Sequence, residues 1–392
     1  MRSQIEGSRA IAQTVARCRP QVVPAYPITP QTHIVEAVGA MVKSGELAPC
    51  VFITVESEFA AMSAALGASA GGARAYTATA SQGLLYMTEA LFNVAGLGLP
   101  VVMTVANRAI GAPINIWNDH SDSMSQRDCG WVQLYAEDNQ AAVALHVVAF
   151  ALAERLSLPV MVCVDGFVLT HAVEPIDVPE ASVVDDFLPP FVPRQVLDPD
   201  EPVTIGAMVG PDAFTEVRVL AHRQLMQALE TFTDLTAHYS ELTGQHLEAV
   251  SSYRTEGTDT VLMTIGSITG TVRDLADELA DTDPFGVVSL TMYRPFPAED
   301  VRHALANAKH VIVIERAFAP GAGGVVSADV RTALAGNPIR ISTVVAGLGG
   351  RAVTTAALRG VLADAAAGTL ETFGFLDVKD DVMARELSEV RA

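Results

Sequence analysis

Residues 20–45 read PQVVPAYPITPQTHIVEAVGAMVKSG, and this stretch sets the pattern for the rest of the chain. The apolar run up to Ala25 predicts a β-strand, and the amphipathic segment from Gln31 predicts a helix that ends at Gly45. Two prolines restrict the backbone of the loop between them, residues 26–30. A strand, a short loop and a helix in this order are typical of a βα unit in a parallel sheet.

The same alternation continues through the first half of the chain. Further apolar runs predict strands at 51–55, 73–81, 99–106 and 159–164, and Ala-rich helical segments lie between them. We therefore expect an α/β fold with a doubly wound parallel sheet.

The second half changes character twice. Residues 174–215 are rich in proline and acidic side chains, which predicts an extended arm, and 215–247 have a helical pattern. A second, smaller α/β unit begins near Asp259, with strands predicted in TVLMTIG, GVVSLTMY, HVIVIE and IRISTVVAG. The expected domains are 1–235, which includes the arm, and 250–392.

Composition limits the classes of partner. The net charge of −20 disfavours nucleic-acid binding, because an acidic surface repels phosphate. Only 18% of the 392 residues are charged, which fits either a surface covered by partner subunits or simply a large, well-buried α/β protein.

Location and redox chemistry follow from the same kind of evidence. No uninterrupted apolar stretch reaches membrane-spanning length, and the N-terminal residues lack the apolar core of a signal peptide. The four cysteines, Cys18, Cys50, Cys129 and Cys163, form no C-x-x-C pair. We therefore expect a cytoplasmic protein without a membrane span, and a chain without its own metal or iron–sulfur site.

Four predicted strand ends carry chemically distinctive residues. In an open parallel sheet, ligands bind beyond the carboxyl ends of the strands. The residues there are Thr29 in YPITP, Glu56 and Glu58 in VESE, Ser81 and Gln82 in SQG, and Arg108 in NRA.

Each of these residues also has an ordinary structural explanation. The Thr29 hydroxyl is placed either to bind a small polar ligand or to cap the following helix. Glu58 is either a functional carboxylate at a helix N-terminus or a simple first-turn acid. Arg108 is placed either to bind a ligand carboxylate or to form an ion pair with Asp119 or Asp122.

Other motifs are weaker signals. The glycine-rich segments 266–271 and 319–325 lack the spacing of phosphate-binding loops, so we expect turns there, with Ser267 as a possible helix cap. The long polar loop at 107–128 is unusual inside a compact domain and indicates a functional role. His33 is expected on the surface, whereas His120 in the long loop is less easily explained.

The motifs taken together, in order, resemble the alpha subunit of 2-oxoacid:ferredoxin oxidoreductases. The resemblance is carried by YPITP, VESE, TATASQGL, NRAIGAPINIWNDHSDSMSQRDCGW, AEDNQ, DGFVLTH, MTIGSITGT, YRPFP and VAGLGGR, and it spans about residues 5–355. It implies a thiamine-diphosphate pyrimidine-type domain followed by a smaller α/β domain that is similar to the transketolase C-terminal domain.

The resemblance also implies roles for the strand-end residues. Glu58 corresponds to the glutamate that hydrogen-bonds N1′ of the cofactor's aminopyrimidine, Thr29 to the threonine that contacts substrate, and Arg108 to the arginine that binds the substrate carboxylate. Four further residues are expected at the cofactor: Tyr26, Pro27, Ser81 and Gln82.

The implied activity belongs to an assembled enzyme. The family converts pyruvate and coenzyme A to acetyl-CoA and CO2 and passes electrons to ferredoxin. Its beta subunit carries the Mg²⁺ and diphosphate site and a 4Fe–4S cluster, and gamma and delta subunits complete the complex. The stretch NIWNDHSD favours pyruvate, and the alternative substrate is a branched 2-oxoacid such as 2-oxoisovalerate. A decayed scaffold subunit is disfavoured by the intact Thr29, Glu58 and Arg108.

Overall fold

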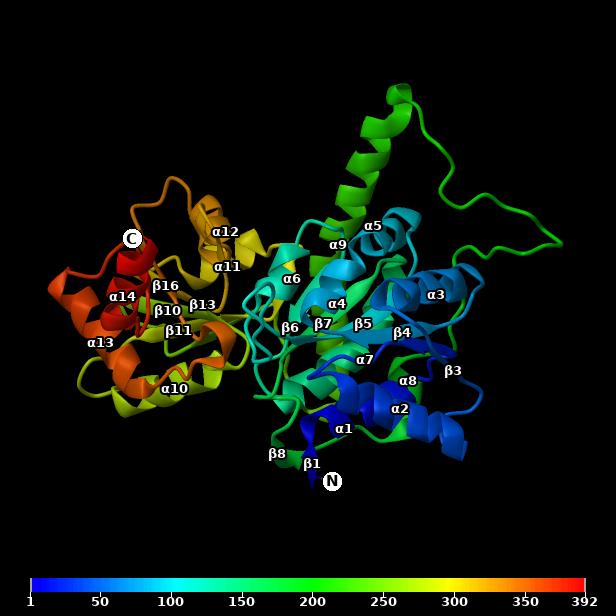
Figure 1. The fold of residues 1–392 in the computed structure, drawn as a ribbon, viewed down its shortest axis with the longest axis horizontal. Helices are drawn as coiled ribbons and strands as arrows, with labels where there is room; N and C mark the ends of the chain where they lie inside the picture. Colours follow the sequence, from blue (N-terminus) through cyan, green and yellow to red (C-terminus); the bar gives the residue numbers. More distant parts are fainter. Residues whose placement is uncertain (1, 391–392) are drawn as a thin grey trace.

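The structure, a computed structural model, describes residues 2–390 and consists of two α/β units that lie side by side (Figure 1). A seven-stranded sheet forms the centre of the first unit, and a six-stranded sheet forms the centre of the second. The predicted α/β class with parallel sheets is confirmed.

The first sheet has the strand order β12-β6-β7-β5-β4-β2-β3, and all of it except β12 is parallel. Its predicted strands are confirmed, whereas β6 was not anticipated. The parallel strands are β2 (Val22–Ala25), β3 (Val51–Thr54), β4 (Ala75–Thr79), β5 (Val101–Asn107), β6 (Val132–Tyr135) and β7 (Val160–Asp165).

Helices cover both faces of this sheet (Figure 1). The helix expected from Gln31 forms and ends at Gly45, whose φ of 82° is accessible to glycine without strain. The helical segment expected between the strands at 73–81 and 99–106 is two helices that meet at Met87. The helices of this unit are α1 (Gly7–Arg17), α2 (Thr32–Ser44), α3 (Glu58–Ala70), α4 (Ser81–Tyr86), α5 (Thr88–Leu97), α6 (Ser121–Ser125) and α7 (Asn139–Leu156).

Strand order reverses at β2, because β3 lies on one side of it and β4 on the other. Pro24 in β2 has no backbone N–H to donate, and its carbonyl instead accepts a 2.8 Å hydrogen bond from the Thr77 hydroxyl of β4. Backbone pairing of the two strands is confined to Val22 and Ala75, at their amino ends. This is the switch point at which an open α/β sheet forms its ligand crevice.

The predicted arm is extended over only part of its length. Residues 173–187 form β8 (Val173–Ile176), which pairs with β1 (Ser3–Glu6), and α8 (Ala181–Phe187), whose Val184 and Phe187 are buried. The expectation of an unpacked segment is wrong there, because these apolar side chains pack onto the first unit. Residues 188–210 contain no helix or strand, and much of this segment loops away from the body of the molecule before it reaches the projecting end of α9 (Figure 1).

Helix α9 (Pro211–Thr243) confirms the helix predicted at 215–247 and projects from the molecule (Figure 1). Its second half is anchored by buried Ala228, Phe232, Leu235 and Tyr239, while its first half is exposed. Within the described part of the chain, no helix, α9 included, is long and apolar enough to cross a membrane.

The second sheet has the order β17-β16-β13-β10-β11-β9, and β9 is antiparallel to its neighbour. Its strands are β9 (Val250–Tyr253), β10 (Thr260–Ile265), β11 (Gly286–Leu290), β13 (His310–Glu315), β16 (Arg340–Val345) and β17 (Phe373–Phe375). Around it lie α10 (Ile268–Glu278), α11 (Ala298–Ala304), α12 (Val326–Ala333), α13 (Thr355–Ala367) and α14 (Asp380–Val390). A two-stranded hairpin, β14 (Phe318–Ala319) with β15 (Gly323–Gly324), occupies the glycine-rich segment that was predicted as a loop.

One prediction in this half is wrong in an informative way. The run 286–293 was expected to be a single strand, but it divides at Thr291. The second piece, β12 (Met292–Arg294), pairs with β6 of the first sheet, and the Tyr135 backbone N–H donates to the Thr291 carbonyl at 2.7 Å. Residues 286–293 contain no glycine or proline after Gly286, so no turn residue marks where the chain passes from one sheet to the other.

Candidate functional site

The loops that follow β2, β3, β4 and β5 open at the same edge of the first sheet, because these strands are parallel. The loop after β3 leads into α3, whose first residue is Glu58. Ser57 caps this helix, its hydroxyl accepting a 3.2 Å hydrogen bond from the Ala60 N–H. Glu58 is buried and Glu56 is exposed, so the two acids lie in different surroundings.

The Glu58 carboxylate has no partner among the described residues, although its side chain is only 8% exposed. It lies against Gly83 of α4, where a Cβ atom would come within 2.7 Å of Glu58 Oε1 and 2.6 Å of Thr79 Oγ1. The Thr79 hydroxyl is also buried without a hydrogen bond. Buried polar groups are normally paired, so two unpaired oxygen groups beside a glycine are suited to a polar ligand.

Asp122 ties together the loops after β4 and β5. One carboxylate oxygen accepts backbone N–H groups of Ser81 and Arg108, both at 2.9 Å, and the other accepts from the Asn107 amide at 2.8 Å and the Ser123 N–H at 2.7 Å. Burial raises the pKa of the Asp122 carboxyl to about 6, and these hydrogen bonds oppose the shift. The sequence had suggested Asp122 only as an ion-pair partner.

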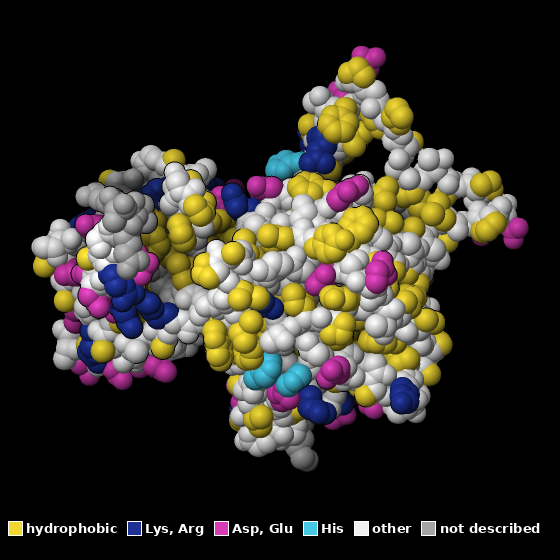
Figure 2. Space-filling model, in the orientation of Figure 1, with side chains coloured by type: hydrophobic (Ala, Val, Ile, Leu, Met, Phe, Trp, Pro, Cys, Tyr) yellow, Lys and Arg dark blue, Asp and Glu magenta, His cyan; other side chains and the backbone are white. Residues whose placement is uncertain are grey.

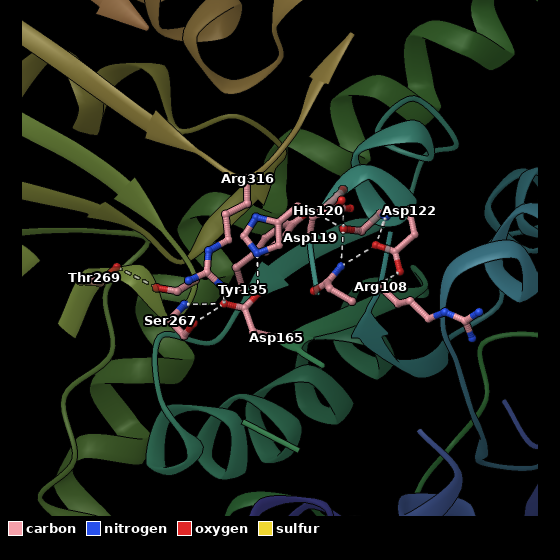
Figure 3. Close-up of polar contacts among 12 residues, drawn as sticks. Arg108, Asp119, His120, Asp122, Tyr135, Asp165, Ser267, Thr269 and Arg316 are labelled. Atoms are coloured by element: carbon pink, nitrogen blue, oxygen red, sulfur yellow. Dashed lines mark hydrogen bonds and ion pairs between the residues drawn. The ribbon is translucent and has the colours of Figure 1, made fainter. Parts of the chain in front are cut away.

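The Arg108 side chain is buried, yet it meets no carboxylate among the described residues. Its Nη1 donates to the Thr29 carbonyl at 2.8 Å and its Nε to the Asn115 carbonyl at 3.2 Å. The guanidinium points away from Asp122 (Figure 3), so the alternative of an ion pair with Asp119 or Asp122 is wrong. An unpaired cation of this kind is suited to a ligand carboxylate.

The β2–α2 loop presents its side chains outward. Thr29 is exposed, and Gln31, not Thr29, is the N-cap of α2, so the capping alternative for Thr29 is also wrong. Pro27 and Tyr26 are exposed beside it. Buried Gln31, which sequence reasoning missed, donates to the carbonyls of Tyr26 at 2.9 Å and Ala78 at 3.1 Å and so fixes the loop to β4.

Ser81 and Gln82 are placed differently from one another. Ser81 is buried with a φ of 52°, and its hydroxyl donates to the Ala109 carbonyl and the Gln82 side chain. Gln82 is half-buried and donates to the Gly111 carbonyl at 3.2 Å. The Ser81 hydroxyl is therefore occupied in holding its loop.

A second buried cluster joins the two units (Figure 3). Asp165, at the end of β7, accepts from His120 Nε2 at 2.6 Å, Arg316 Nη1 at 2.9 Å and the Ser267 backbone N–H at 2.9 Å. Burial alone would raise the pKa of Asp165, but Arg316, His120 and Ser267 together hold it well below its usual range. Ser267 stands at the predicted N-cap position of α10, but its hydroxyl makes no capping hydrogen bond and donates to Asp165 instead.

Comparisons with known families agree over most of the chain. Residues 13–236 match the family described as pyruvate flavodoxin/ferredoxin oxidoreductase, thiamine diP-bdg, and residues 258–358 match pyruvate:ferredoxin oxidoreductase core domain II. The chain is 42% identical over 390 residues to pyruvate synthase subunit PorA of Methanosarcina barkeri, covering 97% of each protein. It is 37% identical over 365 residues to ketoisovalerate oxidoreductase subunit VorA of Pyrococcus abyssi, covering 92% of each.

The fold also resembles a solved structure. The chain aligns with a 2-oxoglutarate:ferredoxin oxidoreductase from Magnetococcus marinus with a TM-score of 0.73 and 21% identity. The alignment covers 93% of this chain and 65% of that one. At this identity the similarity shows a shared fold.

Proposed function

The chain belongs to the pyruvate flavodoxin/ferredoxin oxidoreductase family through its thiamine-diphosphate-binding domain, and from this we propose that it is the alpha subunit of a pyruvate:ferredoxin oxidoreductase. The assembled enzyme would oxidatively decarboxylate pyruvate with coenzyme A, form acetyl-CoA and CO2, and pass electrons to ferredoxin. The observation that carries the proposal is a pair of buried charged side chains, Glu58 and Arg108, in strand-end loops at one edge of the sheet: Glu58 has no partner among the described residues, and the Arg108 guanidinium contacts only backbone carbonyls and no carboxylate.

The residues around Glu58 fit the aminopyrimidine half of thiamine diphosphate. The unpaired carboxylate and the unpaired Thr79 hydroxyl offer hydrogen-bonding groups, and Gly83 keeps the space beside them free of a side chain. When bound, thiamine diphosphate supplies carbanion chemistry. Glu58 would hold a proton at N1′ of the ring, and the loops that carry Tyr26, Pro27, Ser81 and Gln82 would enclose it.

Arg108 and Thr29 are proposed to bind the 2-oxoacid. The guanidinium would hold the substrate carboxylate in a charge-assisted hydrogen bond, and the exposed Thr29 hydroxyl would donate to the same substrate. Because every 2-oxoacid has this carboxylate, these two residues do not choose between pyruvate and 2-oxoisovalerate. The higher identity to the pyruvate relative, 42% against 37%, favours pyruvate.

The remaining parts of the site are proposed to lie on partner chains. These are a beta subunit with Mg²⁺, the diphosphate site and a 4Fe–4S cluster, together with gamma and delta subunits. Support comes from large apolar side chains on the surface, which gather along the exposed half of α9 and over the nearby face of the first unit (Figure 2). Phe214 and Leu220 on α9 are 55% and 63% exposed, and Ile114 in the long loop is 74% exposed.

We also propose the domain division 1–235 and 250–392. The two family matches, which end at 236 and begin at 258, and the two separate sheets support it. On this division the second domain serves mainly in assembly. It also contacts the first domain, where its Ser267 and Arg316 donate to Asp165, the residue that pairs with His120.

The test is to produce this chain with and without the proteins encoded beside it. The complex should reduce ferredoxin in a reaction that needs pyruvate, coenzyme A and thiamine diphosphate, while the isolated chain should be inactive. Measuring kcat/KM for pyruvate and 2-oxoisovalerate then separates the two substrates. Turnover by the isolated chain, or a higher kcat/KM for 2-oxoisovalerate, would contradict the proposal as stated.

A further inference from the structure

Three potential metal ligands meet on the surface of the first unit, outside the site described above. They are Glu6 at the end of β1, His33 in the first turn of α2, and His171 in the turn after β7. The three come from distant parts of the sequence, and one ligand atom from each lies within 4.8 Å of the other two. Figure 2 shows two histidine side chains side by side on the surface of this unit.

The geometry is close to that of a coordination site. Glu6 Oε1 lies 2.6 Å from His33 Nδ1, and the imidazole rings of His33 and His171 have centroids 4.6 Å apart. Around a tetrahedral Zn²⁺ with bonds of about 2.0–2.2 Å, ligand atoms stand roughly 3.3–3.5 Å apart. The His33 side chain is 47% exposed and free to turn, so only a small adjustment separates the observed arrangement from coordination.

His171 is oriented in the way that ligating histidines usually are. Its Nδ1 lies 2.7 Å from the Thr170 hydroxyl, which also accepts the Phe167 backbone N–H at 2.8 Å. When Nδ1 donates to this hydroxyl, Nε2 keeps its lone pair for a metal. Burial and the neighbouring His33 lower the pKa of His171, with Glu6 opposing, which favours the neutral imidazole that a metal requires.

From this arrangement we infer that Glu6, His33 and His171 form a binding site for Zn²⁺ or a similar divalent transition metal. Two imidazoles and one carboxylate form a ligand set that binds zinc in preference to magnesium or calcium, because the latter two ions favour oxygen ligands throughout. Arg9, whose Nε is 3.7 Å from Glu6 Oε2, is the cation with which the metal would share this carboxylate.

A metal here would join segments that border the proposed catalytic loops. His33 is the second residue of α2, just after the β2–α2 loop. The turn that carries His171 begins at Gly166, where a Cβ would meet Pro30 Cγ and the Asn107 carbonyl at 2.5 Å each. Coordination would therefore join three segments: strand β1, the turn after β7, and helix α2. We assign the site a structural role in holding these segments together.

The experiment uses the full-length chain, freed of metal with a chelator. Zn²⁺ is titrated in a calorimeter, and Co²⁺ is titrated with visible absorption as the readout. The variants are His33→Ala, which alters a surface side chain, and His171→Gln. The matched control is His238→Ala. His238 also faces a glutamate, Glu241 at 3.6 Å, but no third potential metal ligand lies beside this pair among the described residues.

We expect one equivalent of Zn²⁺ to bind the wild-type chain and to raise its Tm by a few degrees. Losing one ligand should weaken binding at least about tenfold, since even the loss of a residue behind a ligand costs that much. His238→Ala should bind like the wild type, and so should Cys50→Ser, which removes the one half-buried thiol among the described cysteines. Absence of saturable binding to the wild type, wild-type affinity in the His33 or His171 variant, or loss of binding in Cys50→Ser would overturn the inference.

Discussion

The guanidinium of Arg108 donates a 2.8 Å hydrogen bond to the backbone carbonyl of Thr29, and this bond joins the loops after β5 and β2 across the end of β4. The contact uses the backbone of Thr29 and leaves its exposed hydroxyl free. The two residues proposed to bind substrate are therefore positioned by each other as well as by their own strands.

Replacing Arg108 with alanine should mainly weaken use of the 2-oxoacid. A charge-assisted hydrogen bond contributes roughly 1.5–3 kcal/mol, so kcat/KM for pyruvate should fall about tenfold to a hundredfold in the assembled enzyme. Thiamine diphosphate affinity should change little. Arg302→Ala, an exposed side chain on α11, is the control. Unchanged kinetics in Arg108→Ala would assign this residue a purely structural role.

The two glutamates of VESE should differ sharply in function. Glu58→Gln should fold and assemble but lose about 10²–10⁴-fold of activity, because a neutral amide cannot take the carboxylate's part in proton transfer. Glu56→Gln should do much less, because Glu56 is exposed. Steady-state turnover and thiamine diphosphate binding measure both variants. The reverse order of effects would move the proposed role to Glu56.

Gly83→Ala tests the space beside Glu58 without changing a charged residue. The added methyl would lie 2.7 Å from Glu58 Oε1 and 2.6 Å from Thr79 Oγ1, closer than such contacts allow. We expect weaker thiamine diphosphate binding and lower activity in the complex, with secondary structure retained. The comparison is Gly96→Ala on α5, where a Cβ would meet nothing within 4 Å. Equal cofactor affinity in the two variants would argue against a ligand at this position.

The Asp165 cluster should make stability depend on pH in a defined direction. Asp165→Asn removes a buried anion, which should cost about 3–5 kcal/mol of unfolding free energy near neutral pH. The pKa of Asp165 is lowered in the folded protein, so the stabilisation is present above the ordinary Asp pKa of about 3.9 and is lost as the pH falls below it. The difference in stability between wild type and variant should therefore stay constant from about pH 7 to pH 5 and shrink below about pH 4.

Scanning calorimetry across this pH range measures the effect. Asp259→Asn provides the comparison, because Asp259 pairs with Lys309 at 2.7 Å on the surface, where such a pair contributes about 1 kcal/mol at most. If Asp165→Asn were no more destabilising than this control at neutral pH, the cluster would not stabilise the contact between the two units.

Much of the first sheet could be predicted because central strands such as β5 and β7 are buried on both faces and appear as short apolar runs. The break between α4 and α5 could not, since Met87 is a good helix former and no glycine or proline interrupts the segment. The division of 286–293 could not be predicted either, because the pairing of β12 depends on β6, a strand more than 150 residues earlier in the sequence.

The site was predictable at the level of residue type and strand end. What the sequence could not supply was the partner of each group. Arg108 and Asp122 are close in sequence and opposite in charge, yet Asp122 accepts the backbone N–H of Arg108, and the guanidinium donates to the Thr29 carbonyl and meets no carboxylate among the described residues. Gln31 and Asp122 were missed as loop-holding residues because their roles arise from contacts between loops, which no local pattern records.

The pairing of β12 with β6 has a consequence for how the gene can be divided. A chain cut after α9 would leave β6 as an open sheet edge, with backbone N–H and C=O groups exposed to other chains and therefore prone to aggregate. The C-terminal half thus covers this edge of the N-terminal half, and one buried apolar cluster contains residues of both halves, such as Met103 and Val288. If one half were exchanged between related proteins, residues 292–294 of one would still have to pair with residues 133–134 of the other. Strand β12, which lies well beyond the apparent domain boundary, therefore limits recombination at that boundary.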